Sequence, residues 1–278
     1  MIKKIINLCP TGTLTTKINS FAPIQPIEII EDVLACHEIG ISVVHLHARD
    51  EEGNNTYKKE VYQQIILGIK KYAPELVIGV SLSGRYFNEK SLRSEVLSLH
   101  PDLASLTMSS LNFPQSASIN APETILWLIE QMNKYGVNPE IECFDSGMLN
   151  YANYLIQKGI LKESLYINVI LGNLFNAGTD IATVSSIINN LPKNAKVCFG
   201  GIGNAQLKSN VVGLLEADGV RVGLEDNLYL IEKQKATNLK LLQRIHRLIN
   251  ELDYNYMNTS DFKNLGYGNR KVNNLGVE

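Results

Sequence analysis

The 278-residue sequence predicts an α/β fold built as a single (β/α)8 TIM barrel. Short runs rich in β-branched residues alternate with longer segments whose apolar residues recur three and four positions apart, which is the pattern of strands alternating with amphipathic helices. No Pro- or Ser-rich linker interrupts this alternation, and the length suits a barrel of about 250 residues. The alternative, a doubly wound open sheet, usually has a Gly-rich turn after its first strand, where Thr11-Gly12-Thr13 offers one glycine.

Eight strands are expected, each followed by a helix. The strands are predicted at Ile2–Cys9, Val43–His47, Leu76–Leu82, Leu103–Met108, Pro139–Phe144, Leu165–Leu171, Ala195–Gly201 and Gly219–Leu224. A first helix is predicted between Pro26 and Gly40, and the others at Lys58–Lys71, Glu89–Leu97, Pro122–Tyr135, Met148–Lys158, Thr183–Asn190, Asn204–Leu215 and Lys235–Leu252.

The ends of the first helix follow from residue chemistry. Pro26 suits the first turn, where a missing N–H breaks no hydrogen bond, and Gly40 suits the stop at the C-terminus. Residues 1–278 are predicted to form one domain. The polar stretch from about residue 253 predicts an irregular tail that wraps the outside of the barrel or a partner subunit.

Composition excludes several classes of protein. A net charge of −2, with 45% apolar and 19% charged residues, indicates a globular chain and not a disordered one. No basic excess points to nucleic acid, and no apolar run of the ~20 residues needed for a membrane span is present. Four scattered cysteines and an N-terminus without a secretory h-region predict a reduced, cytoplasmic setting.

A pair of histidines predicts a metal site. His45 and His47 fall at the C-terminal end of the second predicted strand, and their alternate spacing places both rings on one face. Val44 and Leu46 suit the helix layer, so the imidazoles face the barrel interior near the catalytic rim. A divalent metal would satisfy both rings. The alternative is that the two histidines hydrogen-bond to polar groups of the core.

The last strand offers a third ligand. Arg221, Gly223 and Glu225 share one face of it, and closure of a barrel separates this strand from the second by one strand. Glu225 can therefore complete a two-histidine, one-carboxylate set, which suits zinc first and also iron or manganese. The alternative interprets Glu225-Asp226 as an acidic pair opening a helix.

Hydroxyl groups line the same rim. They occur at alternate, inward-facing positions at the ends of the third and fourth strands, and such groups with a nearby glycine amide can hold a carboxylate. These positions are Ser81, Ser83, Ser105, Thr107 and Ser109, beside Gly84.

Together these motifs resemble the β-keto acid cleavage enzymes, whose founding activity is cleavage of 3-keto-5-aminohexanoate. The resemblance runs from the first strand to the last helix and includes His45-Leu46-His47, the Ser81–Gly84 turn, Leu111-Asn112-Phe113, Asn120-Ala121-Pro122, Pro139-Glu140-Ile141-Glu142, Ser146-Gly147-Met148 and Arg221-Val222-Gly223-Leu224-Glu225-Asp226-Asn227. It implies a TIM barrel, a Zn²⁺ ion, a homotetramer, and a Claisen-type reaction of a β-keto acid with acetyl-CoA that gives acetoacetate and a new acyl-CoA.

The resemblance also implies roles for single residues. His45, His47 and Glu225 match the zinc ligands, and Asp226 and Arg221 match the catalytic base and its charged partner. The positions that hold the carboxylate and the keto end of the substrate are matched by Ser81, Gly84, Ser105 and Thr107.

Two positions depart from the family pattern. Leu14 stands where the enzyme for the aminated substrate has a glutamate, so the distal end of this protein's substrate is expected not to be cationic. After the sixth strand, residues 171–178 lack the paired glycines of the family's G-x-x-G-G loop.

Two other functions fit parts of the sequence. A metal-dependent TIM-barrel hydrolase also uses H-x-H on a strand, but usually needs further histidines on later strands. A ligand-binding barrel that has lost the acetyl-CoA reaction would retain the metal and form no acyl-CoA.

Overall fold

The computed structural model describes residues 1–268, and in that part of the chain eight parallel strands close into a barrel. The predicted (β/α)8 fold is confirmed. The barrel strands, in spatial order, are β1 (Lys3–Leu8), β2 (Val43–Leu46), β5 (Val77–Val80), β6 (Leu103–Thr107), β9 (Asn138–Cys143), β10 (Tyr166–Leu171), β11 (Lys196–Gly201) and β12 (Gly219–Val222). Parallel pairing of β12 with β1 closes the ring.

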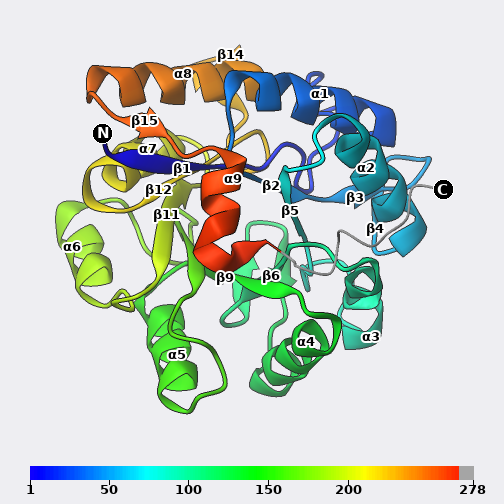
Figure 1. Cartoon of the computed structure of the whole chain (residues 1–278), viewed down its shortest axis with the longest axis vertical. Coiled ribbons are helices and arrows are strands. Elements are labelled where there is room, and N and C mark those ends of the chain that lie inside the picture. The colour runs from blue at the N-terminus through cyan, green and yellow to red at the C-terminus, as the bar shows by residue number, and fades with distance from the viewer. Residues whose placement is uncertain (269–278) are drawn as a thin grey trace.

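The helices surround the strands as a ring (Figure 1). They are α1 (Pro26–Ile39), α2 (Lys59–Tyr72), α3 (Lys90–Arg93), α4 (Pro122–Tyr135), α5 (Ser146–Gln157), α6 (Ile181–Asn189), α7 (Ala205–Glu216) and α8 (Asn238–Glu251). Because helices cover the outside of the barrel and side chains fill its inside, most residues of the barrel strands are buried.

Helix ends form where the sequence supplies capping groups. Pro26 occupies the first turn of α1, and the Glu28 carboxylate accepts a hydrogen bond from the backbone N–H of Gln25 at 2.9 Å. Asp145 and Asp180 cap α5 and α6 by accepting hydrogen bonds from backbone N–H groups three residues ahead. These contacts satisfy donors that have no partner inside the helix.

The helix expected at Glu89–Leu97 is divided in the structure into α3 and a 3₁₀ helix, η1 (Glu95–Leu99). The Arg93 side chain is buried at this division. Its guanidinium donates hydrogen bonds to the carbonyl of Leu82 at 2.8 Å and to Oδ1 of Asn120 at 2.7 Å. These hydrogen bonds attach the end of α3 to the loops at the C-terminal end of the barrel.

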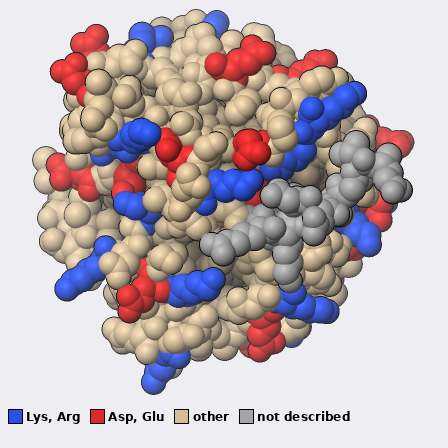
Figure 2. All heavy atoms as spheres, viewed as in Figure 1, with Lys and Arg blue, Asp and Glu red and all other residues tan. Residues whose placement is uncertain are grey.

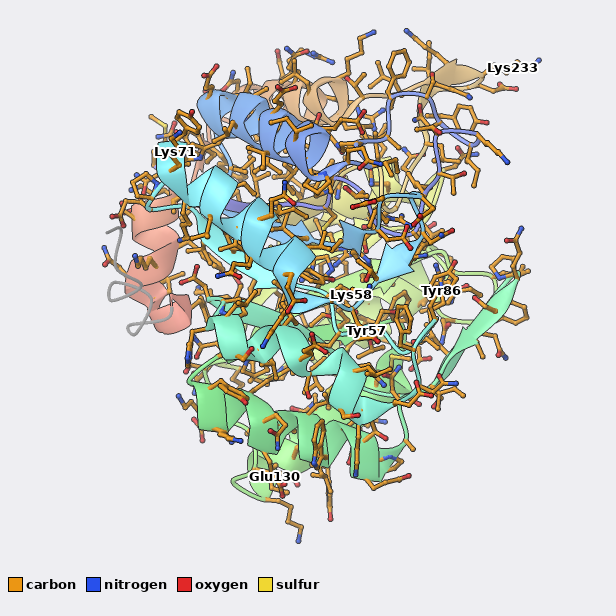
Figure 3. The ribbon with its side chains drawn as sticks, turned by 90° about the vertical axis from the view of Figure 1, so that its right-hand side faces the viewer. Tyr57, Lys58, Lys71, Tyr86, Glu130 and Lys233 are labelled. Atoms are coloured by element: carbon orange, nitrogen blue, oxygen red, sulfur yellow. The ribbon has the colours of Figure 1, made fainter. Side chains whose placement is uncertain are left out.

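Short hairpins that the periodicity does not predict extend the rim. They are β3–β4 (Ala48–Arg49 with Asn55–Thr56), β7–β8 (Leu111–Phe113 with Ser116–Ser118) and β13–β14 (Tyr229–Ile231 with Gln234–Lys235). Figure 3 shows Lys233, in the turn of the last hairpin, at the end of the barrel opposite α9. The catalytic rim is therefore built partly from strands too short to show an alternating pattern.

The chain after α8 closes the N-terminal end of the barrel. Strand β15 (Asn255–Tyr256) pairs with β1, and helix α9 (Thr259–Phe262) leads into a π-helical turn, η2 (Lys263–Tyr267). Figure 1 shows α9 across the middle of the helix ring. The segment expected to be an irregular tail thus contains the regular elements β15, α9 and η2, the last of which ends at residue 267. Its residues 269–278 lie outside the described part of the chain.

This closing segment has an aromatic core. Phe262, which is 0% exposed, and Tyr267 pack on Ile5, Val43, Val77, Leu103, Tyr166 and Cys198 of the lower barrel layer. The Tyr267 hydroxyl donates a hydrogen bond to the Leu165 carbonyl at 3.0 Å. Side chains therefore fill the N-terminal end of the barrel interior, and a catalytic site is expected at the C-terminal end of the strands.

On the described part of the face drawn in Figure 2, Lys and Arg side chains are interspersed with those of Asp and Glu. Among residues 1–268, none of the helices combines the length and the apolar character needed to cross a membrane.

A buried polar contact connects the helix layer to the end of β12. The Asn238 side chain accepts a hydrogen bond from the Leu224 N–H at 2.8 Å and donates to the Asp32 carboxylate at 2.7 Å. Burial raises the pKa of Asp32 to about 6, although the bond from Asn238 opposes this shift. Asp32 and Asn238 therefore fix the backbone immediately before Glu225.

We expect Phe262→Ala to lower the free energy of unfolding by about 3 to 5 kcal/mol, because it empties a buried aromatic site. Urea denaturation followed by circular dichroism measures this change. Phe175→Ala is the matched control, since Phe175 is 53% exposed, and we expect a change within about 0.5 kcal/mol. Equal effects of the two substitutions would contradict the role of the aromatic core.

Asp32 makes stability depend on pH. Its pKa is higher in the folded chain than the ordinary 3.8, so the folded state holds the extra proton and stability falls as pH rises toward and through about 6. We expect Asp32→Asn to gain about 1 to 2 kcal/mol relative to the parent chain between about pH 4.5 and about pH 7.5. Urea denaturation at both pH values tests this, and a constant difference would contradict it.

Candidate active site

The two histidines lie where the sequence places them, at the C-terminal end of β2. His45 is in the strand and His47 follows it immediately, with ring centroids 5.2 Å apart. Nδ1 of His45 is 2.9 Å from Oε2 of Glu140, while its buried Nε2 has no hydrogen-bond partner among the described residues. A histidine held through one nitrogen by a carboxylate, with the other free, is oriented as a metal ligand.

Glu140 is the centre of a buried polar layer. Its Oε1 accepts hydrogen bonds from the side-chain amides of Asn7 and Asn168, both at 2.7 Å. Gly79, which pairs with His45 across β2 and β5, provides the space, because a Cβ there would come within 2.8 Å of Oε2 of Glu140. The position of His45 is therefore set from four other strands, β1, β5, β9 and β10.

Glu225 joins this pair from beyond β12. The ligand atoms of His45, His47 and Glu225 all lie within 4.8 Å of one another, and Nε2 of His47 is 3.4 Å from Oε1 of Glu225. The strand order β12–β1–β2 brings them together, as closure predicts. Gly12 makes room, because a Cβ on it would meet Cγ of Glu225 at 2.4 Å.

One guanidinium connects three carboxylates at this rim. Arg221, whose side chain is 2% exposed, donates to Asp226 at 2.8 Å, to Glu142 at 3.0 Å and to Glu225 at 2.7 Å. The second oxygen of Glu142 accepts a hydrogen bond from the Thr107 hydroxyl at 2.9 Å. The predicted partnership of Arg221 with Asp226 is thus one part of a larger ion-pair network.

The network moves the pKa values of the two neighbouring acids in opposite directions. Burial by itself raises the pKa of Glu225, but His47 and Arg221 outweigh it and hold that pKa well below its ordinary value. Burial also raises the pKa of Asp226, and here it outweighs the opposing Arg221. Glu225 therefore suits cation binding and Asp226 suits proton transfer.

The cluster fits a divalent cation. Burial lowers the pKa of His45, yet the nearby carboxylates of Glu140 and Glu225 outweigh it and raise this pKa to about 9, so the position favours positive charge. Arg221 and its three carboxylates sum to 1 − 3 = −2. Oε2 of Glu225, like Nε2 of His45, is buried without a partner in residues 1–268. Both orphaned atoms belong to the predicted ligand set.

A cavity of about 220 Å³ opens over this cluster. Among the predicted site residues its wall includes His47, Ser81, Thr107, Arg221, Glu225 and Asp226. A side pocket of about 40 Å³ shares Thr13, His47, Ser81 and Ser83 with it. The structure therefore brings two of the predicted ligands, His47 and Glu225, together with Asp226 and three of the predicted hydroxyl groups, to one cavity.

Three predicted substrate residues are not among those that line these two cavities. Ser105 is buried, and its hydroxyl accepts the Leu82 N–H at 3.0 Å. Gly84 packs so tightly on the loop before α4 that a Cβ would come within 2.4 Å of the Ile119 carbonyl. Leu14 packs on the hydrophobic core, and its carbonyl accepts a hydrogen bond from Arg49 at 2.8 Å. Ser105 therefore holds the Ser81–Gly84 turn through Leu82, and Gly84 allows that turn to pack against the loop before α4.

Sequence reasoning gave no role to Glu140, Glu142 or Arg85. Glu140 and Glu142 stand at alternate positions of β9, so their spacing mirrors that of His45 and His47 and could have identified them. Arg85 directly follows the Ser81–Gly84 turn and lines the cavity. No periodic signal marks it, because it lies in a loop.

Comparisons with known proteins agree with this geometry. The family model described as beta-keto acid cleavage enzyme matches residues 3–265. A 3-oxoadipate:acetyl-CoA acetyltransferase of Cupriavidus necator is 32% identical over 252 residues, which are 89% of this chain and 88% of that protein. A 3-keto-5-aminohexanoate cleavage enzyme of Fusobacterium nucleatum is 30% identical over 256 residues, or 91% and 93% of the two chains.

The fold has a close counterpart among solved structures. The apo structure of ObcA superimposes with a TM-score of 0.78 at 19% identity, over 90% of this chain and 66% of that one. The relatives are named as acetyltransferases or cleavage enzymes, and the family is enzymatic. The protein therefore belongs to the β-keto acid cleavage enzyme family.

Proposed function

We propose that this protein is a zinc-dependent transferase that reacts a β-keto acid with acetyl-CoA to give acetoacetate and a new acyl-CoA. The observation that carries the proposal is the shared cavity of His47, Glu225, Asp226 and Arg221, with His45 directly behind it. The family and the names of its relatives support the general reaction.

His45, His47 and Glu225 would hold the cation. Two imidazoles and one carboxylate form the ligand set of many catalytic zinc sites. When bound, such an ion acts as a Lewis acid that lowers the cost of removing a proton next to a ketone. Glu140 orients His45 through Nδ1, which leaves Nε2 as the ligand atom.

Asp226 would take the proton from the carbon between the ketone and the carboxylate of the substrate. Its raised pKa makes it a better base than an exposed aspartate. Arg221 holds both oxygens of Asp226, at 2.8 and 3.4 Å, and so fixes the direction from which the proton is removed. The hydroxyls of Ser81, Ser83 and Thr107 line the same cavity and would bind the substrate carboxylate.

Acetyl-CoA would enter over the loop between β10 and α6. This loop is closed by backbone hydrogen bonds from Gly172 to the Ala177 carbonyl and from Ala177 to the Phe144 carbonyl. Leu174 is 77% and Phe175 53% exposed there, so the loop offers apolar surface in place of the paired glycines. A ligand-binding barrel without the coenzyme reaction is the second candidate, favoured by this altered loop.

Other features of the proposal rest on the resemblance. Leu14 replaces a glutamate and cannot pair with an ammonium, so the distal end of the substrate is not cationic. A homotetrameric assembly follows the family pattern, and a cytoplasmic setting follows the cysteine usage described above.

Product analysis tests the reaction. Zinc-loaded protein is incubated with acetyl-CoA and a panel of β-keto acids, and mass spectrometry follows acyl-CoA products. We expect acetoacetate and one new acyl-CoA in equal amounts for at least one acid. Asp226→Asn should lower kcat by roughly 100-fold or more, because it removes the base but keeps the shape. Zinc binding without product from any acid would favour the ligand-binding barrel.

Metal affinity tests the ligand set separately. We expect Glu140→Gln to weaken zinc binding roughly 10- to 100-fold, because it removes the carboxylate that orients His45. Competition with a chromophoric chelator measures this, and Glu130→Gln on the outer side of α4 (Figure 3) is the matched control. Zinc binding that is undiminished in both His45→Ala and Glu225→Ala would refute the site.

A further inference from the structure

Arg85 is a cation in the wall of the catalytic cavity that the reaction described above does not use. It follows the Ser81–Gly84 turn, and Figure 3 shows its neighbour Tyr86 at the end of the barrel opposite α9. Nη1 of Arg85 donates a hydrogen bond to the Thr13 hydroxyl at 2.9 Å. Its guanidinium stacks on the Phe113 ring, 3.4 Å from the centroid. These two contacts hold the planar group in a fixed orientation.

The charge of Arg85 is not paired within the described chain. In residues 1–268 no carboxylate oxygen lies within 4.0 Å of its guanidinium nitrogens. Arg221, in the same cavity, has three carboxylate partners. Burial lowers the pKa of Arg85, with the more distant acids opposing the shift. A half-buried guanidinium whose desolvation no ion pair offsets is suited to an anionic ligand.

We propose that Arg85 binds a second carboxylate at the distal end of the substrate, so that this protein acts on β-keto diacids. The proposal rests on the proposed function, and it names the class of acid that the same cavity selects. The guanidinium presents a planar set of donors that matches the two oxygens of a carboxylate.

The surrounding charges favour this class over the alternatives. The acids in the cavity wall are Glu142, Glu225 and Asp226, and each is bound by Arg221. Within residues 1–268 none of them lies within 4.0 Å of the Arg85 guanidinium, so an ammonium group beside Arg85 would find no ion-pair partner. A cationic distal end would also be repelled by Arg85. A neutral alkyl end would contact Leu111, Phe113 and Phe144 but would leave the guanidinium without an ion-pair partner.

A matched pair of acids tests the proposal by turnover. 3-Oxoadipate and 3-oxohexanoate have the same chain length and differ in the distal carboxylate, and their products, succinyl-CoA and butyryl-CoA, are resolved by mass. We expect the parent chain to prefer the diacid in kcat/KM. Arg85→Gln should lower kcat/KM for the diacid roughly 10- to 100-fold, the size of a lost charge-assisted hydrogen bond, and leave the monoacid unchanged.

Arg247→Gln is the matched control, because Arg247 lies exposed on α8 and outside the cavity. It should change neither value. Equal losses for both acids in Arg85→Gln, with a raised KM for acetyl-CoA, would overturn the proposal by assigning Arg85 to a phosphate of the coenzyme. No loss for the diacid would overturn it by leaving Arg85 a structural support for Thr13 and Phe113.

Calorimetry separates this proposal from the proposed function. Titration of the zinc-loaded protein with each acid, without acetyl-CoA, should show tighter binding of the diacid by the parent chain, and loss of that preference in Arg85→Gln. If this preference is found but no acyl-CoA forms, the proposed reaction fails and the role of Arg85 stands. If acyl-CoA forms from both acids with no preference, the reaction stands and the role of Arg85 is refuted.

Discussion

The rim of this barrel depends on the charge of one buried guanidinium. Arg221 allows Glu142, Glu225 and Asp226 to occupy neighbouring positions, each within 3.0 Å of its nitrogens. Without it, three buried carboxylates would repel one another and take up protons. By itself Arg221 lowers the pKa of both Glu225 and Asp226. At Glu225 burial is outweighed by His47 acting with Arg221, which hold the pKa well below its ordinary value, whereas at Asp226 burial outweighs Arg221 and raises the pKa. The two adjacent acids therefore differ in acidity because His47 contacts Glu225.

A second constraint lies one layer below. Glu140 is fully buried, and its oxygens are shared among His45, Asn7 and Asn168, which come from three strands. The polar layer separates the apolar lower barrel, filled by Phe262 and Tyr267, from the open cavity above. The barrel interior therefore changes from apolar to polar within the length of one strand, and His45 lies at that boundary.

Two glycines at the site leave space for carboxylates. Gly12 lies against Glu225 and Gly79 against Glu140, at distances that a Cβ would not tolerate without a shift of the carboxylate side chain. Gly12 also has a φ of +54°, in the region that favours glycine. The absence of a side chain at these two positions therefore matters to the site as much as the carboxylates themselves.

The barrel and the grouping of the proposed metal ligands follow from the sequence alone. Periodicity alone distinguishes strands from helices, and alternation within a strand places His45 and His47 on one face whatever the rest of the chain does. Closure of the barrel then brings β12 next to β1, so Glu225 could also be assigned. These inferences succeed because they depend on local geometry and on one topological fact.

Which polar residues line the cavity depends instead on the three-dimensional path of the chain. Ser105, Gly84 and Leu14 read like substrate contacts, and they fall outside the lining of the cavity over the ligand cluster, since a loop's path depends on distant partners such as Arg93 and Arg49. Arg85 lies in a loop and has no periodic signal. Its orientation is set by Thr13 and Phe113, which are distant in sequence. The closing segment after residue 253 was equally hidden, because the three short elements β15, α9 and η2 gain their order from the barrel layer they cover and not from a pattern of their own.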